Sequence, residues 1–108
     1  MEKWNNQKTK ELIEVILAIK KEKEAKAFIR DLMTEKEIIE FGNRWKAARM
    51  LSSNLSYPKI QKETGLSTRT IARISDWLKN GKGGYKLMLK KLYSHHRNSS
   101  RKRLVMTD

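Results

Sequence analysis

One stretch in the middle of the chain carries two helix-start signals with a glycine between them, and it constrains the fold more than any other. Ser56 can cap a helix, and Pro58 falls in the first turn, where a missing backbone N–H costs little. This helix is predicted over Tyr57–Thr64 and ends at Gly65, which adopts a positive φ without a Cβ penalty. Ser67 then caps a second helix. Two helices joined by a tight turn are predicted.

The second helix has one apolar face and one polar, basic front. Ile71, Ile74 and Leu78 recur at i, i+3 and i+7, which predicts one buried stripe. A glycine turn followed by such a helix is typical of a helix-turn-helix, here over about residues 56–79. The same pattern also occurs in proteins that never touch DNA, so by itself it leaves both interpretations open.

In a helix-turn-helix, the second helix enters the major groove and its N-terminal side chains reach base edges. Arg69 could donate two hydrogen bonds to a guanine, and Ala72 is small enough to allow close approach. Gln61 and Thr64 depart from the small and aliphatic residues usual at their positions. The candidate DNA-binding residues are Lys59, Gln61, Lys62, Ser67, Thr68, Arg69, Thr70, Ala72 and Arg73.

Helix breakers are scarce, with one proline and five glycines in 108 residues, and the periodicity is helical, so the fold class is predicted to be all-α. The segment 12–19 is apolar on more than one side and needs cover that burial between two chains would supply. A second short helix is predicted around residues 27–32. Thr34 and Glu37 form a capping box that starts a longer helix, ending near residues 52–54.

The charge is strongly positive and unevenly distributed. The chain has 25 Lys and Arg against 12 Asp and Glu; residues 56–108 hold 13 of the basic and 3 of the acidic side chains. Such a balance favours a polyanionic partner.

The length predicts one domain. Cysteine is absent, which excludes disulfides and thiolate chemistry, and no apolar run is long enough to span a membrane, so a cytoplasmic protein is expected.

Other candidate sites are weak. His95 and His96 are adjacent, point apart on a helix and lack an acidic cluster, so no metal site is predicted. Glu35, Glu37 and Glu40 fit a helix start, where carboxylates favour the macrodipole, better than acid–base catalysis. We predict no enzyme and no cofactor. The aromatic residues at helical core spacing, predicted to pack rather than to stack on bases, are Tyr57, Trp77 and Tyr85.

Several stretches resemble the Trp repressor superfamily, and most closely its YerC/YecD-type branch. They are R-D-L-M-T (30–34), K-A-A-R-M-L (46–51), Y-P-K-I-Q-K-E-T-G-L-S-T-R-T-I-A-R-I (57–74) and G-Y-K-L-M-L-K-K-L (84–92). The resemblance implies an intertwined homodimer of bacterial type with about six helices per chain. It covers roughly residues 10–93, and we assign residues 1–93 to the DNA-binding domain. Residues 94–108, rich in Ser, His, Asn and Arg, are predicted to form a basic, flexible tail, which could act as an electrostatic arm.

The resemblance also implies an effector pocket. Trp repressor holds tryptophan with two arginines, which match Arg44 and Arg73; an ordinary basic surface explains these two arginines equally well. The following glycine and serine of the repressor match Ile74 and Trp77, whose side chains are expected to fill the ligand's volume and to share one face with Arg73. A vestigial effector pocket and no tryptophan response are therefore predicted, and any other small effector is unknown.

The sequence thus predicts a homodimeric, sequence-specific transcriptional regulator that binds operator DNA without a metal or a membrane. The alternative is a module that uses the same basic helical dimer to bind RNA or another protein.

Overall fold

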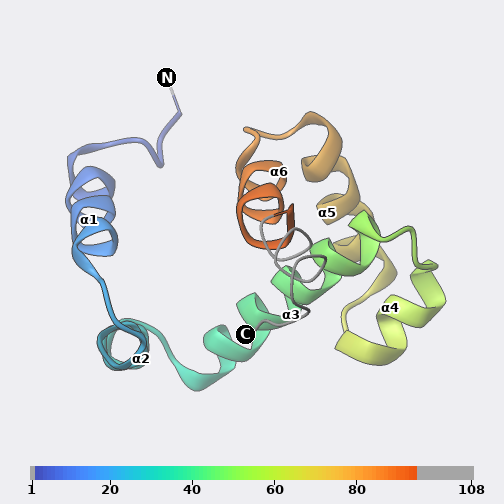
Figure 1. Cartoon of the computed structure of the whole chain (residues 1–108), viewed down its shortest axis with the longest axis horizontal. Helices are drawn as coiled ribbons and strands as arrows, with labels where there is room; N and C mark the ends of the chain where they lie inside the picture. The colour runs from blue at the N-terminus through green and yellow to red at the C-terminus, as the bar shows by residue number, and fades with distance from the viewer. Residues whose placement is uncertain (1, 95–108) are drawn as a thin grey trace. The chain divides into compact units, whose positions relative to one another are not determined.

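The computed structural model describes residues 2–94, which form six α-helices and a final π-helical turn (Figure 1). The elements are α1 (Gln7–Ala18), α2 (Glu22–Leu32), α3 (Glu35–Ser52), α4 (Tyr57–Thr64), α5 (Thr68–Asn80), α6 (Gly84–Leu89) and η1 (Lys90–Ser94). These residues contain no strand, and the all-α prediction is confirmed. The tail predicted from residue 94 onward lies outside the described residues, apart from Ser94 at the end of η1.

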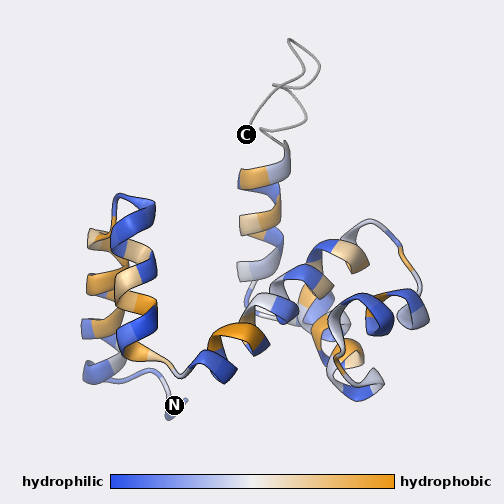
Figure 2. Cartoon of the chain, turned by 90° about the horizontal axis from the view of Figure 1, so that it is seen from below, coloured by the Kyte–Doolittle hydropathy of each residue, from blue (hydrophilic) through white to orange (hydrophobic). Residues whose placement is uncertain are grey.

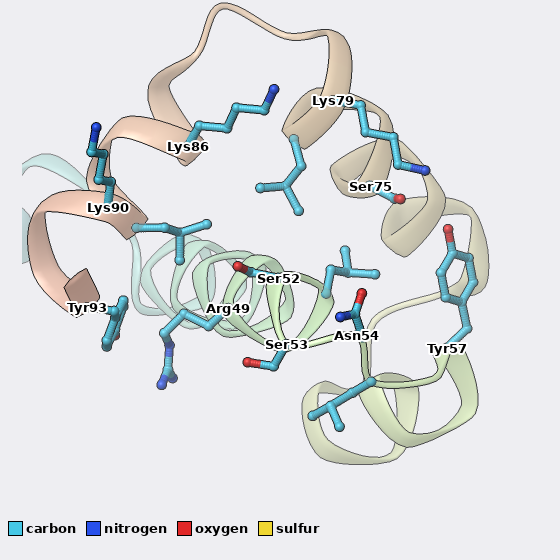
Figure 3. A pocket seen from close by; sticks show the side chains of 14 residues that line it. Arg49, Ser52, Ser53, Asn54, Tyr57, Ser75, Lys79, Lys86, Lys90 and Tyr93 are labelled. Carbon is cyan, nitrogen blue, oxygen red and sulfur yellow. The ribbon is translucent and has the colours of Figure 1, made fainter. Parts of the chain in front are cut away.

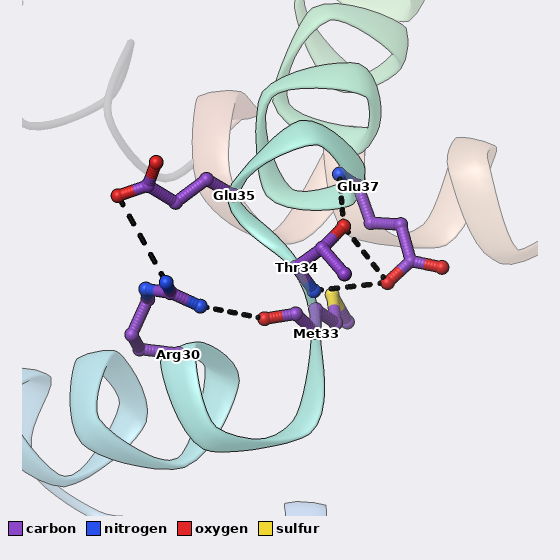
Figure 4. Close-up of polar contacts among 5 residues, drawn as sticks. All are labelled: Arg30, Met33, Thr34, Glu35 and Glu37. Carbon is purple, nitrogen blue, oxygen red and sulfur yellow. Dashed lines mark hydrogen bonds and ion pairs between the residues drawn. The ribbon is translucent and has the colours of Figure 1, made fainter.

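The capping box that the sequence predicts at the start of α3 is present (Figure 4). The backbone N–H of Glu37 donates to the Thr34 hydroxyl oxygen at 3.1 Å, and the Glu37 carboxylate accepts from the Thr34 N–H at 3.0 Å. Arg30 donates from the last turn of α2 to the Met33 carbonyl at 3.0 Å. Local hydrogen bonds thus fix the corner between α2 and α3.

The described chain divides into two compact units, one up to Ile39 and one from Glu40 onward, with the boundary inside α3. From its length, the chain is expected to have a single hydrophobic core. The two units differ sharply in how many of their side chains are buried. Neither α1 nor α2 has a buried residue, and the hydrophobic core lies in the second unit. The apolar side chains of α1 and α2 therefore find little cover within their own unit.

In the first unit, large apolar side chains of α1 and α2 remain exposed, and Figure 2 colours the helices near the N-terminus with many hydrophobic residues. Leu17 is 75% exposed and Ile16 is 51% exposed. Leu12 and Phe28 are half-buried. Exposed apolar surfaces of this kind are common at sites where proteins contact other molecules.

The second unit buries a compact core. Its fully buried residues are Ala47, Ala48, Ile60, Ile71 and Ile74, and Leu66 is 5% exposed. They bring together α3, α4, α5 and the turn between α4 and α5, with α5 contacting both α4 and α6. The predicted stripe on α5 is therefore buried as expected at its first two positions, and its third, Leu78, is half-buried.

The described helices include none that is both long and apolar enough to cross a bilayer.

Candidate nucleic-acid interface

The turn between α4 and α5 has the predicted helix-turn-helix construction. The Ser56 hydroxyl oxygen accepts from the Lys59 N–H at 3.3 Å and starts α4. Gly65 ends that helix with φ 73°, in the left-handed region that favours glycine. The Ser67 hydroxyl oxygen accepts from the Thr70 N–H at 3.1 Å and starts α5. Each helix boundary is thus set by its own side chain or by glycine.

Thr64 has a role in this turn that the sequence pattern did not reveal. Its side chain is 7% exposed. The hydroxyl donates to the Ile60 carbonyl at 2.8 Å, and its oxygen accepts from the Leu66 N–H at 3.2 Å. Because both of its hydrogen-bonding capacities are used, the hydroxyl is tolerated where an aliphatic side chain is usual. Through these two hydrogen bonds, Thr64 connects the last turn of α4 to Leu66, the buried apolar residue of the turn.

The buried stripe of α5 determines which side chains of this helix face outward. Since Ile71 and Ile74 are both 0% exposed, the opposite side of the helix is left to solvent. Arg69, Ala72 and Arg73 are exposed on that side. Arg69 lies in the first turn, where a side chain at the N-terminal front of such a helix can reach base edges.

The structure brings the nine candidate DNA-binding residues onto two neighbouring helices and the turn that joins them. Eight of them are exposed, and Thr70 is half-buried. The basic members take part in no ion pair among residues 2–94: they are Lys59, Lys62, Arg69 and Arg73. No carboxylate of the described residues therefore neutralises these four charges.

Ser67 and Thr70 also serve the fold. The Ser67 hydroxyl caps α5 and donates to the Thr70 hydroxyl oxygen at 3.1 Å. Their first role is therefore to start the helix that carries Arg69.

The residues of the predicted effector pocket lie in different environments. Arg44 forms an ion pair with Glu40, with 3.0 Å between Nε and the carboxylate oxygen, and its guanidinium lies 5.5 Å from the centre of the Phe41 ring. Arg73 is exposed on α5. Arg44 is thus held by neighbours on its own helix.

Arg73, Ile74 and Trp77, expected to share one face, differ in burial, and their role in an effector pocket stays a prediction. Ile74 is 0% exposed and belongs to the core, whereas Trp77 is 41% exposed. Ile74 and Trp77 are three positions apart, or about 60° around the helix, and the edge of the buried stripe falls between them. Ile74 therefore fills the core of the second unit. The cation–π contact among residues 2–94 is that of Arg44 with Phe41, so Arg73 does not stack on Trp77.

Three aromatic rings fasten the C-terminal helical segment to α3. Trp45 stacks with Tyr85 and Tyr93, at centroid distances of 6.3 Å and 6.5 Å. Burial raises the pKa of the Tyr85 hydroxyl, and the positive charge of Arg44 partly opposes that rise. Tyr85 thus packs against the core as predicted. Tyr57 and Trp77 do not belong to the core and are 36% and 41% exposed.

No group of acidic and histidine side chains among residues 2–94 is arranged to hold a metal ion, and His95 and His96 lie outside the described residues.

Comparisons with known proteins agree with this architecture. The sequence profile of the Trp repressor protein family matches residues 7–93. The protein YerC of Bacillus subtilis strain 168, which is uncharacterized, is 34% identical over 102 residues, covering 94% of this chain and 98% of YerC.

Two crystal structures share the fold. A TrpR-like protein from Eubacterium eligens ATCC 27750 superposes with a TM-score of 0.80 at 34% identity, covering 84% of this chain and 94% of that one. A candidate Trp repressor from Staphylococcus aureus gives a TM-score of 0.79 at 31% identity, covering 84% and 91%. Both sequence and fold place the protein with these relatives, and the chain belongs to the Trp repressor protein family.

Proposed function

We propose that the chain is a homodimeric, sequence-specific transcriptional regulator that binds duplex DNA through α4 and α5. The observation that carries the proposal is the outward face of α5. Arg69, Ala72 and Arg73 are exposed there, on a helix whose opposite side is anchored in the core. Membership of the Trp repressor protein family supports the same reading.

The position of each residue on α4 or α5 determines whether it contacts a base or a phosphate. Arg69, in the first turn of α5, recognises a base edge, because a guanidinium can donate two hydrogen bonds to one guanine. Lys59 and Lys62 on α4, with Arg73 on α5, contact phosphates and supply affinity that is independent of sequence.

A second copy of the chain covers the apolar surfaces of α1 and α2. These surfaces include Ile16, Leu17 and Leu32, each about half exposed or more in the single chain. A dimer would bury them and also present two copies of α5 to a two-fold symmetric operator.

Tryptophan does not regulate this chain. The proposal rests on Arg44, whose guanidinium is already engaged by Glu40 and Phe41, and on the bulky Ile74 and Trp77 at positions where Trp repressor has small residues.

Competition at fixed salt tests the DNA proposal. A labelled palindromic duplex selected from genomic fragments is displaced in parallel by itself, by unrelated duplex DNA and by a structured RNA. We expect the selected duplex to compete at least tenfold better than the other two, because specific complexes exceed non-specific ones by far more than this. Equal competition by unrelated duplex would contradict sequence-specific readout. Preferred competition by the RNA would favour an RNA-binding module on the same scaffold.

A further inference from the structure

The second unit contains an open pocket that the proposed DNA contacts do not use. It has a volume of about 1070 Å³ and lies between the C-terminal end of α3, the helix α5 and the segment formed by α6 and η1 (Figure 3). Pockets of this order accept small organic molecules. None of Arg44, Arg73, Ile74 and Trp77 lines it, so it is distinct from the predicted effector pocket.

The lining combines an apolar part with hydroxyl and amide groups. Leucine side chains from α3, α5, α6 and the loop after α3 supply the apolar part: Leu51, Leu55, Leu78 and Leu89. Figure 3 shows Ser75 and Lys79 on α5 across the pocket from Lys86 and Lys90 on the α6–η1 segment. A ligand with an apolar body and a polar end would match this division.

The charge of the pocket is entirely positive. Its lining contains Arg49, Lys79, Lys86 and Lys90 and no carboxylate, and none of these cations takes part in an ion pair among residues 2–94. Four cations that have no ion-pair partner among the described residues favour the binding of an anion at this opening.

The acidic residues between positions 40 and 94 are occupied elsewhere. Glu40 pairs with Arg44, Glu63 pairs with Lys46, and Asp76 accepts a hydrogen bond from Asn80. The charge of the pocket is therefore not neutralised by the carboxylates between positions 40 and 94.

Arg49 has one polar atom without a hydrogen-bond partner among the described residues. This atom is the buried Nε. Buried donors in folded proteins nearly always find an acceptor. Arg49 lines the pocket, but this buried atom is not open to a ligand in it, so the case for an anion depends on the cations of the lining.

We propose that this pocket binds a small organic anion, a carboxylate or phosphate attached to an apolar body. The cations hold the anionic group, and the leucine side chains cover the apolar body. A nucleic acid phosphate alone would leave the leucine surface unused, and a neutral apolar molecule would leave the cations unused.

The position of the pocket couples it to DNA binding, an effect that rests on the proposed function. Lys79 lines the pocket and follows Ala72 by seven residues, which is about two helical turns, so both lie on the same side of α5. An anion bound beside Lys79 would lower the positive potential of the surface that meets DNA. We therefore expect the ligand to weaken DNA binding, and DNA to weaken ligand binding by the same factor.

Amide NMR titrations of the whole chain, without DNA, test the pocket itself. Phenylacetate serves as the organic anion, phenylacetamide as its neutral counterpart and inorganic phosphate as the anion without an apolar body. We expect saturable shifts at Ser75, Leu78 and Leu89 with phenylacetate, and binding at least about tenfold weaker with either of the other two probes.

Paired variants separate a pocket from general attraction to a basic protein. The double variant Lys86→Gln with Lys90→Gln removes two lining cations, and Lys91→Gln removes an exposed neighbour that does not line the pocket. We expect the double variant to weaken phenylacetate binding about tenfold and Lys91→Gln to change it less than twofold. Thermal unfolding checks that both variants fold as the parent does.

Three results would overturn the proposal: equal binding of phenylacetate and phenylacetamide, equal binding of phosphate, or equal weakening by the two variants. Absence of saturable shifts, as when a second copy of the chain covers the pocket, would overturn it as well. The effect on DNA is measured separately with the selected duplex. Ligand binding without an effect on DNA would contradict only the coupling, and DNA binding without ligand binding would contradict only the pocket.

Discussion

The two units of this chain differ in how completely they bury their large apolar side chains. The second unit encloses Ile60, Ile71 and Ile74 completely, whereas the first leaves Ile16 half exposed and Leu17 three-quarters exposed. Burying a side chain of this size contributes about 1.5–3 kcal/mol, so the first unit forgoes stabilisation that the second obtains within one chain. Under the proposed function this difference corresponds to two roles: the second unit holds α5 in place for DNA recognition, and a second copy of the chain completes the first unit.

The largest effect is expected in the core of the second unit. Replacing Ile71→Ala removes a fully buried side chain and should lower the free energy of unfolding by about 2–5 kcal/mol. Urea unfolding at a fixed protein concentration measures it. The control Arg69→Ala, on the exposed side of the same helix, should stay within about 0.5 kcal/mol of the parent. Similar losses for both variants would contradict the distinction between the two faces of α5.

A slightly smaller effect is expected at the apolar surface of the first unit. Ile16→Asp places a carboxylate on a surface that a second copy is proposed to cover, and it should weaken self-association by at least about 100-fold. Sedimentation equilibrium gives the association constant. Lys10→Asp introduces the same residue at a polar, exposed position of α1 and serves as the control. Unchanged association of Ile16→Asp would show that a second copy does not cover this surface.

The third prediction concerns DNA recognition by the second unit. Arg69→Ala should reduce the preference for a specific over a random duplex by about 1–3 kcal/mol, while leaving the molecular mass of the assembly unchanged. Lys62→Ala is the matched control on α4. It should weaken both duplexes alike and lower the slope of log affinity against log salt by about 0.9. A specific-to-random ratio that Arg69→Ala leaves intact would place base recognition elsewhere.

The smallest expected effect is that of tryptophan. DNA affinity should be the same with and without millimolar tryptophan, and calorimetry should register no binding heat, because a ligand that prefers neither state shifts no equilibrium. Arg44→Ala should leave this result unchanged. Tight, saturable tryptophan binding with a matching rise in DNA affinity would contradict this prediction. It would indicate that Arg44 and Arg73 hold tryptophan, as the matching arginines of Trp repressor do.

The local features of the fold were predictable from sequence because each depends on a few adjacent residues. The caps at Ser56 and Ser67, the glycine stop at Gly65 and the Thr34–Glu37 capping box are all present as predicted. Such signals act through hydrogen bonds within one turn of helix, so no knowledge of tertiary packing is needed.

Features that depend on tertiary packing could not be predicted from the sequence, because they depend on contacts between residues that are distant in the chain. Helical spacing grouped Ile74 with Trp77, but it does not locate the edge of the buried stripe, which the packing of α3 and α4 against α5 determines. The two hydrogen bonds of the Thr64 hydroxyl likewise depend on the path of the turn.

The pocket beside α5 is a feature of the same kind. Its lining residues lie as far apart in the chain as Arg49 and Tyr93, so no local motif predicts that they meet.

Sequencing of genomic fragments bound by the purified protein tests the central claim most directly, since it examines the recognition helix and the assembly together. We predict enriched duplexes with two-fold symmetric half-sites, their centres about 10–10.5 base pairs or a multiple of that apart, as a symmetric pair of α5 helices requires. Enrichment of fragments with no shared motif, or of a single asymmetric motif, would contradict a dimer that reads DNA through α5.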